Sequence, residues 1–300
     1  MTIEVSDLNG DLPFGARIRG VSTHNVDDPD VQRTLRAVFD DRGMIVFEGM
    51  EPTTQMQLAL SAVFGPPEAH AIREVKEVEG QAPGLVQFDY LDVFEVNGQE
   101  LAAFVPWHFD ACYAGQINRG GVLRALAIPP EGGITSFADG IQLYQALPAK
   151  LREAFAGRNI VYHSHLMFWN LKFGRPASYN PVRVRPAVVD MVAAAKAAPR
   201  AIHPAIWERP DGRHVLHVSP WQAAGIEGME TPEGDALLED LCAEMQAAMR
   251  PWHHRWQADD MVIWDNWRFI HAVSGHPPHH PRQMRRTTIA GDYGLGHLES

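Results

Sequence analysis

From about Phe104 onward, the chain is a series of short apolar stretches broken by glycine, proline and polar turn residues. The clearest of these stretches are Gly121–Ile128, Ile134–Ala138, Arg213–Val218, Met261–Trp264 and Arg286–Ala290. Short strands with turn signals between them are typical of antiparallel barrels and jelly rolls. Because helical patterns also occur along the chain, we predict an α+β protein with a mainly β core.

Several amphipathic segments predict helices that flank this core. Asp30–Phe39 carries an apolar stripe and leads to Gly43, a residue suited to a helix C-cap. The apolar strand Met44–Phe47 follows, and a threonine at position 53 or 54 can cap a helix that ends at Phe64. Further helices are predicted at Ile141–Ala156, where Pro148 opens a second helix, at Val188–Ala198 and at Pro232–Met249.

The chain shows no internal repeat, low-complexity tract or linker rich in Ser and Gly, so we predict a single domain over residues 1–300. One segment, Tyr162–Arg185, is long, aromatic and irregular. Long loops of this kind are either functional lids or poorly ordered segments. We interpret this one as a lid over an active site.

Composition restricts the partners of the chain. Lys and Arg number 26 against 37 Asp and Glu, which gives a formal net charge of −11. A nucleic-acid partner needs surplus basic residues, and a membrane span needs about 18 uninterrupted apolar residues, so we expect neither. No signal-peptide pattern is visible, and the two cysteines suit a reducing compartment. We therefore expect a cytoplasmic protein that acts on a small molecule and binds any metal through His and carboxylate.

The segment Trp107–Asp110 (WHFD) contains a His-x-Asp pattern. Residues i and i+2 of a strand point to the same side, so His108 and Asp110 can bind one ion together. An isolated pair of this kind is more often a surface His and Asp. Here the pair lies between apolar stretches, and the strand and turn at 260–266 lead to His271, a candidate third ligand. Two His and one carboxylate form the facial triad of non-haem iron(II) oxygenases, which leaves positions open for a bidentate 2-oxo acid and O₂.

An arginine-rich strand follows His271. Arg282 and Arg286 are four residues apart on an extended segment, so both can face the interior, whereas Arg285 points away. Arginine suits the remote carboxylate of a dicarboxylate better than lysine, because its fork matches the carboxylate plane. The alternative is a solvated basic edge strand, which the even spacing within an apolar strand disfavours.

The other clustered histidines have no carboxylate at ligand spacing, and we predict that they are loop or surface residues. These clusters are His163/His165, His253/His254 and His276/His279/His280. Trp264, Asp265 and Asn266 are predicted to shape the turn that leads to His271 and not to bind the metal.

With these motifs in place, the chain resembles the taurine dioxygenase / 2,4-dichlorophenoxyacetate dioxygenase family of Fe(II)- and 2-oxoglutarate-dependent enzymes. The resemblance covers most of the chain and depends on three motifs in the family's order. These are WHFD at 107–110, GGITSFAD at 132–139, and Trp264-Asp265-Asn266 followed by His271 and RQMRRTTIAGD at 282–292. It implies a double-stranded β-helix (a jelly roll) with flanking helices, and a homo-oligomer, either a dimer or a tetramer.

The resemblance also assigns roles to residues. It implies that His108, Asp110 and His271 bind Fe(II). Thr135 and Arg282 would hold the distal carboxylate of 2-oxoglutarate. Arg286 would lie near the iron and contact 2-oxoglutarate or the acidic group of the substrate. O₂ is the third reactant, and succinate and CO₂ are the products that this family releases.

The substrate side departs from the taurine-specific members, which have an Asn four residues before the first iron ligand, where this chain has Phe104. His70 lies where the family often has a substrate-contacting His, although a surface-loop His fits equally well. Phe88 and Tyr90 either wall an apolar pocket or pack in the core. We therefore favour an apolar or aromatic carboxylate, with Arg286 at its acidic group, and hydroxylation or cleavage at an ether, ester or C–N bond.

Three other functions remain as alternatives. The first is a sulfonate or sulfate-ester dioxygenase of the same family. The second is a zinc-dependent hydrolase that uses the same two His and one Asp, although it would have no use for Thr135 and the arginines. The third is a non-catalytic binding protein with a degenerate site, which the presence of all three ligands disfavours.

Overall fold

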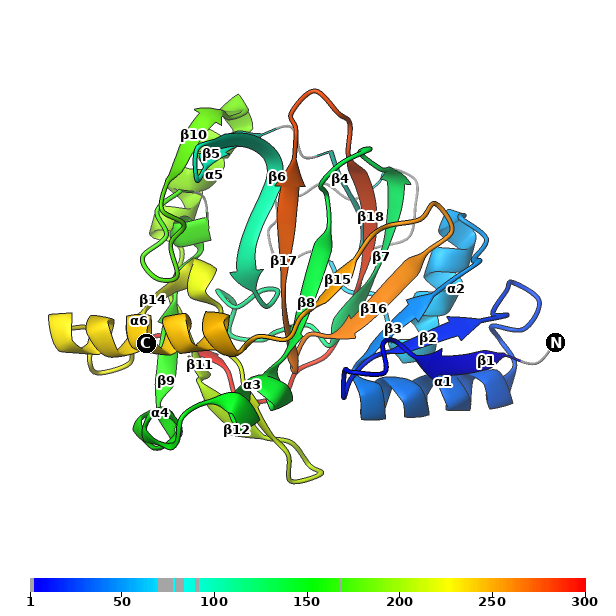
Figure 1. Ribbon diagram of the computed structural model, residues 1–300, viewed down its shortest axis with the longest axis horizontal. Coiled ribbons are helices and arrows are strands. Elements are labelled where there is room, and N and C mark those ends of the chain that lie inside the picture. The colour runs from blue at the N-terminus through cyan, green and yellow to red at the C-terminus, as the bar shows by residue number, and fades with distance from the viewer. Residues whose placement is uncertain (1–2, 70–77, 79–83, 90–91, 168) are drawn as a thin grey trace.

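The computed structural model describes residues 3–69, 78, 84–89, 92–167 and 169–300, and in this part of the chain most strands belong to two large sheets (Figure 1). The first sheet has the order β1 (Glu4–Asp7), β2 (Ala16–Arg19), β3 (Met44–Phe47), β16 (Met261–Asp265), β7 (Gly120–Ala127), β18 (Gln283–Ile289), β4 (Leu85–Phe88). The second has the order β10 (Tyr179–Arg183), β5 (Val93–Val96), β6 (Gln99–His108), β17 (Phe269–His276), β8 (Thr135–Asp139), β15 (Trp252–His254). Strand neighbours are antiparallel apart from β2 and β3, which are parallel. Strands form the core and helices flank it, so the prediction of a mainly β protein with helices is confirmed.

The two large sheets face each other across an apolar core. Side chains of both sheets belong to one buried cluster, and the rings of Phe137 in β8 and Trp264 in β16 lie 5.4 Å apart. Along β3, Met44 and Val46 belong to this inner cluster, whereas Ile45 and Phe47 belong to a second cluster on the outer face. Because alternate residues of a strand face opposite sides and both sides are buried here, β3 is apolar throughout.

Helices cover the outer face of the first sheet. These are α1 (Pro29–Arg42) and α2 (Thr54–Phe64), seen beside β3 in Figure 1. Asp28 caps the start of α1, and Gly43, with φ of 72°, ends it with a hydrogen bond from its N–H to the Phe39 carbonyl. Thr53 caps α2 through the N–H of Met56. Both helices were predicted, and both are confirmed.

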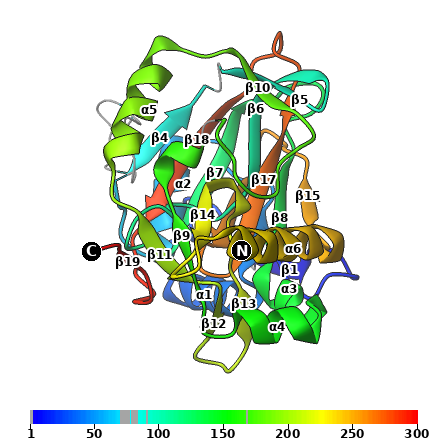
Figure 2. The same cartoon turned by 90° about the vertical axis from the view of Figure 1, so that its left-hand side faces the viewer.

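The remaining elements gather at one side of the second sheet, where α6 crosses in front of the strands (Figure 2). The helices are α3 (Gly140–Ala146), α4 (Ala149–Phe155), α5 (Pro186–Ala197), α6 (Pro232–Ala248), and the 3₁₀ turns η1 (Ser164–Met167) and η2 (Pro220–Gln222). A small sheet has the order β14 (Ala223–Ile226), β9 (Asn159–Tyr162), β11 (Ala201–Pro204), β19 (His297–Leu298), and β12 (Ile206–Glu208) pairs with β13 (His214–Leu216). Pro148 separates α3 from α4, as predicted.

Some predictions need correction. The segment 162–185 is not irregular throughout, because it contains η1 and β10, and β10 pairs with β5. The strand predicted at Arg286–Ala290 begins at Gln283 instead, so Arg282 directly precedes β18. His254 and His276, predicted to be loop or surface residues, lie in β15 and β17 and are buried. No helix among the described residues is long and apolar enough to cross a membrane.

Candidate functional site

The side chains of His108, Asp110 and His271 meet between the two large sheets. His108 ends β6 and pairs in register with His271 of β17, and Asp110 lies in the turn after β6. Oδ1 of Asp110 is 3.7 Å from Nε2 of His108 and 3.8 Å from Nε2 of His271. Among the described residues, this is the His, Cys, Asp and Glu group whose ligand atoms all lie within 4.8 Å of one another. One carboxylate oxygen and two imidazole nitrogens therefore surround a common point.

The two imidazoles are prepared to act as neutral ligands. Nδ1 of His108 is 2.8 Å from the carbonyl oxygen of Pro106 and donates a hydrogen bond to it, so the lone pair lies on Nε2. Burial lowers the pKa of His108 and the pKa of His271, and each residue therefore stays uncharged at neutral pH. A site of two neutral imidazoles and one carboxylate fits a divalent transition metal such as iron(II).

The turn that carries Asp110 is held by Asn266. Oδ1 of Asn266 accepts a hydrogen bond from the N–H of Asp110 at 2.8 Å, and its Nδ2 donates to the carbonyl oxygen of Asp110 at 3.1 Å. Nδ2 also donates to the carbonyl oxygen of Asn118 at 3.1 Å. Ala111, the next residue, has a positive φ of 59°. Asn266 was predicted only to shape the turn before His271. Its side-chain amide also holds the backbone of Asp110, a candidate metal ligand.

Arg286 lies beside the carboxylate of Asp110. Its Nη2 is 2.9 Å from Oδ2 of Asp110, the oxygen that is not shared with the histidines. Its guanidinium lies 5.6 Å from the ring centroid of Trp264, and the ring of Trp264 lies 4.9 Å from that of His271. A Cβ on Gly121, in the neighbouring strand β7, would come within 2.8 Å of Nε of Arg286. Because Gly121 has no side chain, the buried guanidinium of Arg286 fits beside β7.

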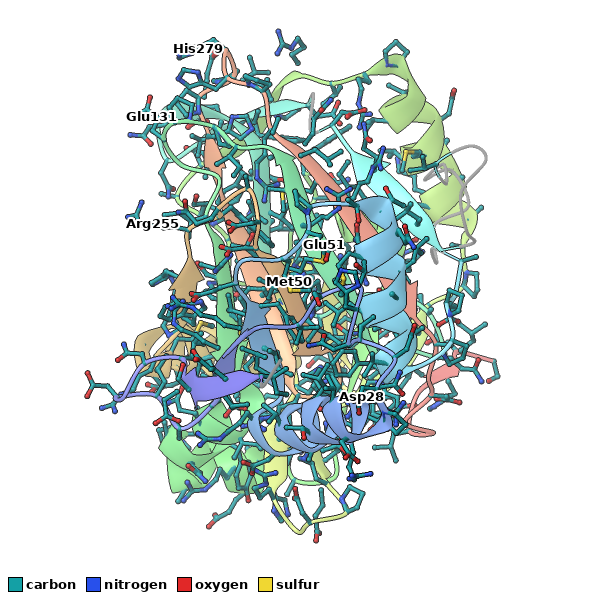
Figure 3. All side chains as sticks on the ribbon, turned by 90° about the vertical axis from the view of Figure 1, so that its right-hand side faces the viewer. Asp28, Met50, Glu51, Glu131, Arg255 and His279 are labelled. Atoms are coloured by element: carbon teal, nitrogen blue, oxygen red, sulfur yellow. The ribbon has the colours of Figure 1, made fainter. Side chains whose placement is uncertain are left out.

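Arg282 and Thr135 meet at one end of the sheets. Nη2 of Arg282 is 3.4 Å from Oγ1 of Thr135, and both residues are buried. At this end the β7–β8 and β17–β18 loops lie close together, with Glu131 and His279 labelled in Figure 3. Arg285 faces the opposite side, where it donates to Thr54 of α2 at 2.6 Å. A buried arginine beside a hydroxyl can bind a carboxylate.

An aromatic cluster extends from the second sheet to the candidate metal ligands. Tyr179 of β10 lies 5.1 Å from Phe94 and 5.8 Å from Phe104 between ring centroids. Trp221 of η2 packs against the same cluster, and its ring lies edge-on to the imidazole of His108 at 5.0 Å. Phe104 is therefore part of an apolar wall next to the candidate metal site.

The other predicted contact residues have different outcomes. Phe88 of β4 pairs in register with Met284, as Val86 pairs with Arg286. Register partners share a sheet face, so Phe88 lies on the same face as Arg286. His70 and Tyr90 lie outside the described residues.

Several residues of the site were not predicted from the sequence. Trp221 and Tyr179 belong to the aromatic cluster, and Trp256 donates its indole N–H to Oγ1 of Thr135 at 3.0 Å. The aromatic content of 162–185 was a partial signal for Tyr179. No sequence pattern marks Trp221 or Trp256, because each reaches the site through packing between distant segments.

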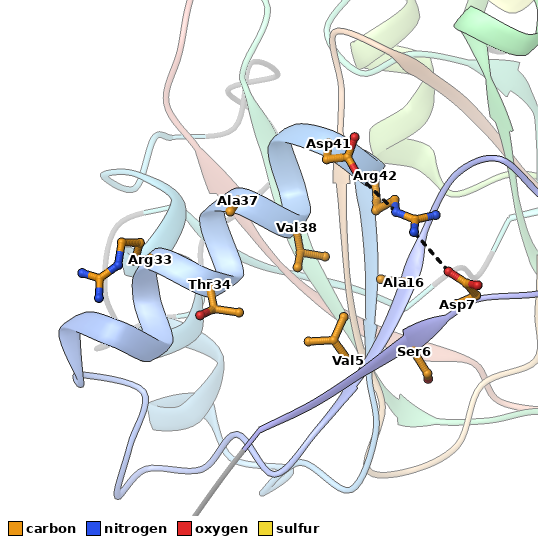
Figure 4. Close-up of a pocket in the computed structure, with 10 residues that line it drawn as sticks. All are labelled: Val5, Ser6, Asp7, Ala16, Arg33, Thr34, Ala37, Val38, Asp41 and Arg42. Carbon is orange, nitrogen blue, oxygen red and sulfur yellow. Dashed lines mark ion pairs between the residues drawn. The ribbon is translucent and has the colours of Figure 1, made fainter.

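A separate surface groove lies between β1 and α1 (Figure 4). Its charged groups form ion pairs, with Arg42 3.2 Å from both Asp7 and Asp41. None of the candidate site residues lines it. The groove therefore has no role in the chemistry of the buried site.

Comparisons with known proteins find similar sequences and a similar fold. The family model described as "Taurine catabolism dioxygenase TauD, TfdA family" matches residues 4–288. The (S)-phenoxypropionate/alpha-ketoglutarate-dioxygenase of Sphingobium herbicidovorans is 28% identical over 94% of this chain and 93% of its own length. An alpha-ketoglutarate-dependent sulfate ester dioxygenase of Pseudomonas putida is 26% identical over 94% of this chain and 88% of its own. A solved structure, described as AAD-2 in complex with Mn(II) and N-oxalylglycine, shares the fold with a TM-score of 0.73 at 24% identity, covering 97% of this chain and 98% of that one.

Proposed function

The chain belongs to the TauD/TfdA family of dioxygenases, and from this premise we propose that it is an Fe(II)- and 2-oxoglutarate-dependent dioxygenase that oxidises a small organic anion. The observation that carries the proposal is the buried set of His108, Asp110 and His271 with Arg286 at its edge. The named relatives are alpha-ketoglutarate-dependent enzymes, which supports the same co-substrate here.

In this proposal, His108, Asp110 and His271 hold iron(II), and Arg282 with Thr135 holds the distal carboxylate of 2-oxoglutarate. When bound, iron(II) would supply the oxidising chemistry together with O₂ and 2-oxoglutarate, and the 2-oxoglutarate would be converted to succinate and CO₂. Arg286 holds Oδ2 of Asp110 and leaves Oδ1 for the metal. The surrounding apolar side chains exclude water, which strengthens the hydrogen bonds and ion pairs inside the site.

The substrate that we propose is an apolar or aromatic carboxylate. The aromatic cluster formed by Phe94, Phe104, Tyr179 and Trp221 would pack against its apolar part. Arg286 would bind its acidic group, since a guanidinium forms bidentate hydrogen bonds with carboxylates. The phenoxypropionate named for one relative has this combination of an aromatic ring and a carboxylate. The outcome, hydroxylation or cleavage beside a heteroatom, depends on which C–H bond faces the metal.

A sulfate ester is the second candidate substrate class, because the sulfate ester dioxygenase of Pseudomonas putida has nearly the same sequence identity to this chain as the phenoxypropionate enzyme, 26% against 28%. Arginine binds sulfate oxygens with the same fork geometry, so Arg286 suits either anion. Taurine is disfavoured, because Phe104 places an apolar ring in the aromatic cluster.

We further propose that the facing sheets form a double-stranded β-helix and that the segment 169–178 covers the substrate side of the site. Leu171 and Trp169 of this segment belong to the aromatic cluster. The segment is fixed at several points, including the hydrogen bonds of Lys172 to Asp235 and to the carbonyl oxygen of Ala224, each 2.8 Å. We therefore expect an ordered cover more than a freely moving flap.

Anaerobic titration of the apo-protein with Fe(II) and then 2-oxoglutarate tests the co-substrate assignment. The expected result is the weak visible charge-transfer band of the chelate, which His108→Ala abolishes. His280→Ala, a change in a surface loop, serves as the matched control and should leave the band intact. Succinate release with O₂ is then compared for phenoxyalkanoates, alkyl sulfates and taurine. Zn(II) binding without any 2-oxoglutarate chelate would instead favour the hydrolase.

A further inference from the structure

The hydroxyl of Thr135 lies between two groups that can only donate hydrogen bonds. Nε1 of Trp256 is 3.0 Å from Oγ1 of Thr135, and Nη2 of Arg282 is 3.4 Å from the same oxygen. Indole and guanidinium nitrogens carry protons and have no acceptor site. Thr135 must therefore accept from both.

This arrangement determines the direction of the hydroxyl proton. A threonine hydroxyl has two lone pairs and one proton. With Trp256 at one lone pair and Arg282 at the other, the proton points to a third partner. A hydroxyl that accepts from a cation is also a stronger donor, because linked hydrogen bonds polarise one another.

The position of the Trp256 side chain is fixed by contacts with its neighbours. It is buried, and its ring meets the imidazole of His254 edge-on at 4.5 Å. His254 pairs in register with Thr135 across β15 and β8, and its Nε2 lies 3.2 Å from Oδ2 of Asp260. Asp260 also accepts the N–H of Gln257 at 3.0 Å, which closes the loop that carries the indole. The indole N–H is therefore fixed on the Thr135 oxygen.

We propose that Trp256 is a positioning residue for the co-substrate: its indole N–H orients the Thr135 hydroxyl so that its proton meets the distal carboxylate of 2-oxoglutarate. This inference rests on the proposed function. It adds a residue that does not itself touch the co-substrate, and it predicts that Trp256 favours 2-oxo acids that have a second carboxylate.

The test measures binding to the Fe(II)-loaded protein without O₂, followed by the chelate absorption band. Trp256→Phe keeps the aromatic ring and removes the N–H. We expect its Kd for 2-oxoglutarate to rise about fivefold, the size of effect that one hydrogen bond has. Its Kd for 2-oxopentanoate, which has the same chelating group but no second carboxylate, should stay unchanged. Trp252→Phe is the matched control, because Nε1 of Trp252 has no hydrogen-bond partner among the described residues.

A double-mutant cycle separates positioning from packing. In a Thr135→Val background, Trp256→Phe should cause no further loss, whereas in a Thr135→Ser background it should again cost about fivefold. Equal weakening of 2-oxoglutarate and 2-oxopentanoate, additive losses in the Thr135→Val background, or a Trp256→Phe protein that binds like wild type would each overturn the inference. If the wild-type protein itself gives no chelate band, the proposed function fails, and the inference fails with it.

Discussion

Replacing Arg268 with methionine should lower the free energy of unfolding by about 3–5 kcal/mol, the usual cost of removing one partner from a buried ion pair. Arg268 and Asp139 are almost wholly buried, with side-chain exposures of 1% and 2%. Nε and Nη2 of Arg268 lie 2.8 and 2.9 Å from the two carboxylate oxygens of Asp139. Without the arginine, the donor that remains for that carboxylate among the described residues is the N–H of Ile141, 3.0 Å away at the start of α3.

Urea unfolding of wild type and Arg268→Met measures this loss directly. Arg213→Met is the matched control, because Arg213 and Asp211 form an exposed pair and such pairs contribute about 0–1 kcal/mol. The double variant Asp139→Asn/Arg268→Met should regain part of the stability, since it removes the uncompensated charge and keeps a cap for α3. A loss below about 1 kcal/mol for Arg268→Met would refute the argument from desolvation.

Three further predictions concern pH, the metal and the substrate. Burial lowers the pKa of His203 to about 4, below its unfolded value of about 6.5. As the pH falls, the unfolded chain binds the proton first, so the contribution of neutral His203 to the free energy of unfolding is fully present above about pH 6.5, and about 3 kcal/mol of it is lost between pH 6.5 and pH 4. Urea unfolding midpoints measured across this pH range should fall accordingly, and they should fall less in His203→Gln. Asn266→Ala should weaken metal binding by about tenfold in a chelator competition, because it releases the turn of Asp110; unchanged affinity would contradict the clamp. Phe104→Ala should raise the KM of an aromatic substrate about tenfold and leave the Kd of 2-oxoglutarate unchanged, and equal changes in both would speak against its place in the substrate wall.

The sequence predicts the parts of this fold whose signals are local. Gly43 and Pro148 mark helix boundaries, and the apolar run Met44–Phe47 predicts a strand buried on both faces. Pairing between strands follows from tertiary contacts, so the neighbours of β16, which are β3 and β7, could not be read from the chain. The strand β10 was missed for the same reason, because its pairing partner β5 lies far away in sequence.

In the candidate site, the predicted residues are those whose side chains carry the chemistry. His108, Asp110 and His271 have the functional groups of a metal site, and their spacing agrees with two strands that converge. The residues that position these side chains, such as Asn266 and Gly121, carry no functional group typical of catalysis or metal binding. An amide or a glycine has many roles in a protein, so only the contacts in the folded chain reveal these two.

The site is built by two sets of elements, and this division suggests how its specificity is determined. The candidate metal ligands, Thr135 and Arg286 lie in or directly beside strands of the two large sheets, and they are held by register and buried hydrogen bonds. Part of the aromatic wall belongs to the second sheet, through Phe104 of β6 and Tyr179 of β10, but the rest comes from η2 and the segment 169–178, which lie outside the two large sheets. Substitutions in these peripheral segments can reshape the apolar part of the candidate site without moving the strands that carry the candidate metal ligands. We therefore expect changes there to alter substrate choice while 2-oxoglutarate binding persists.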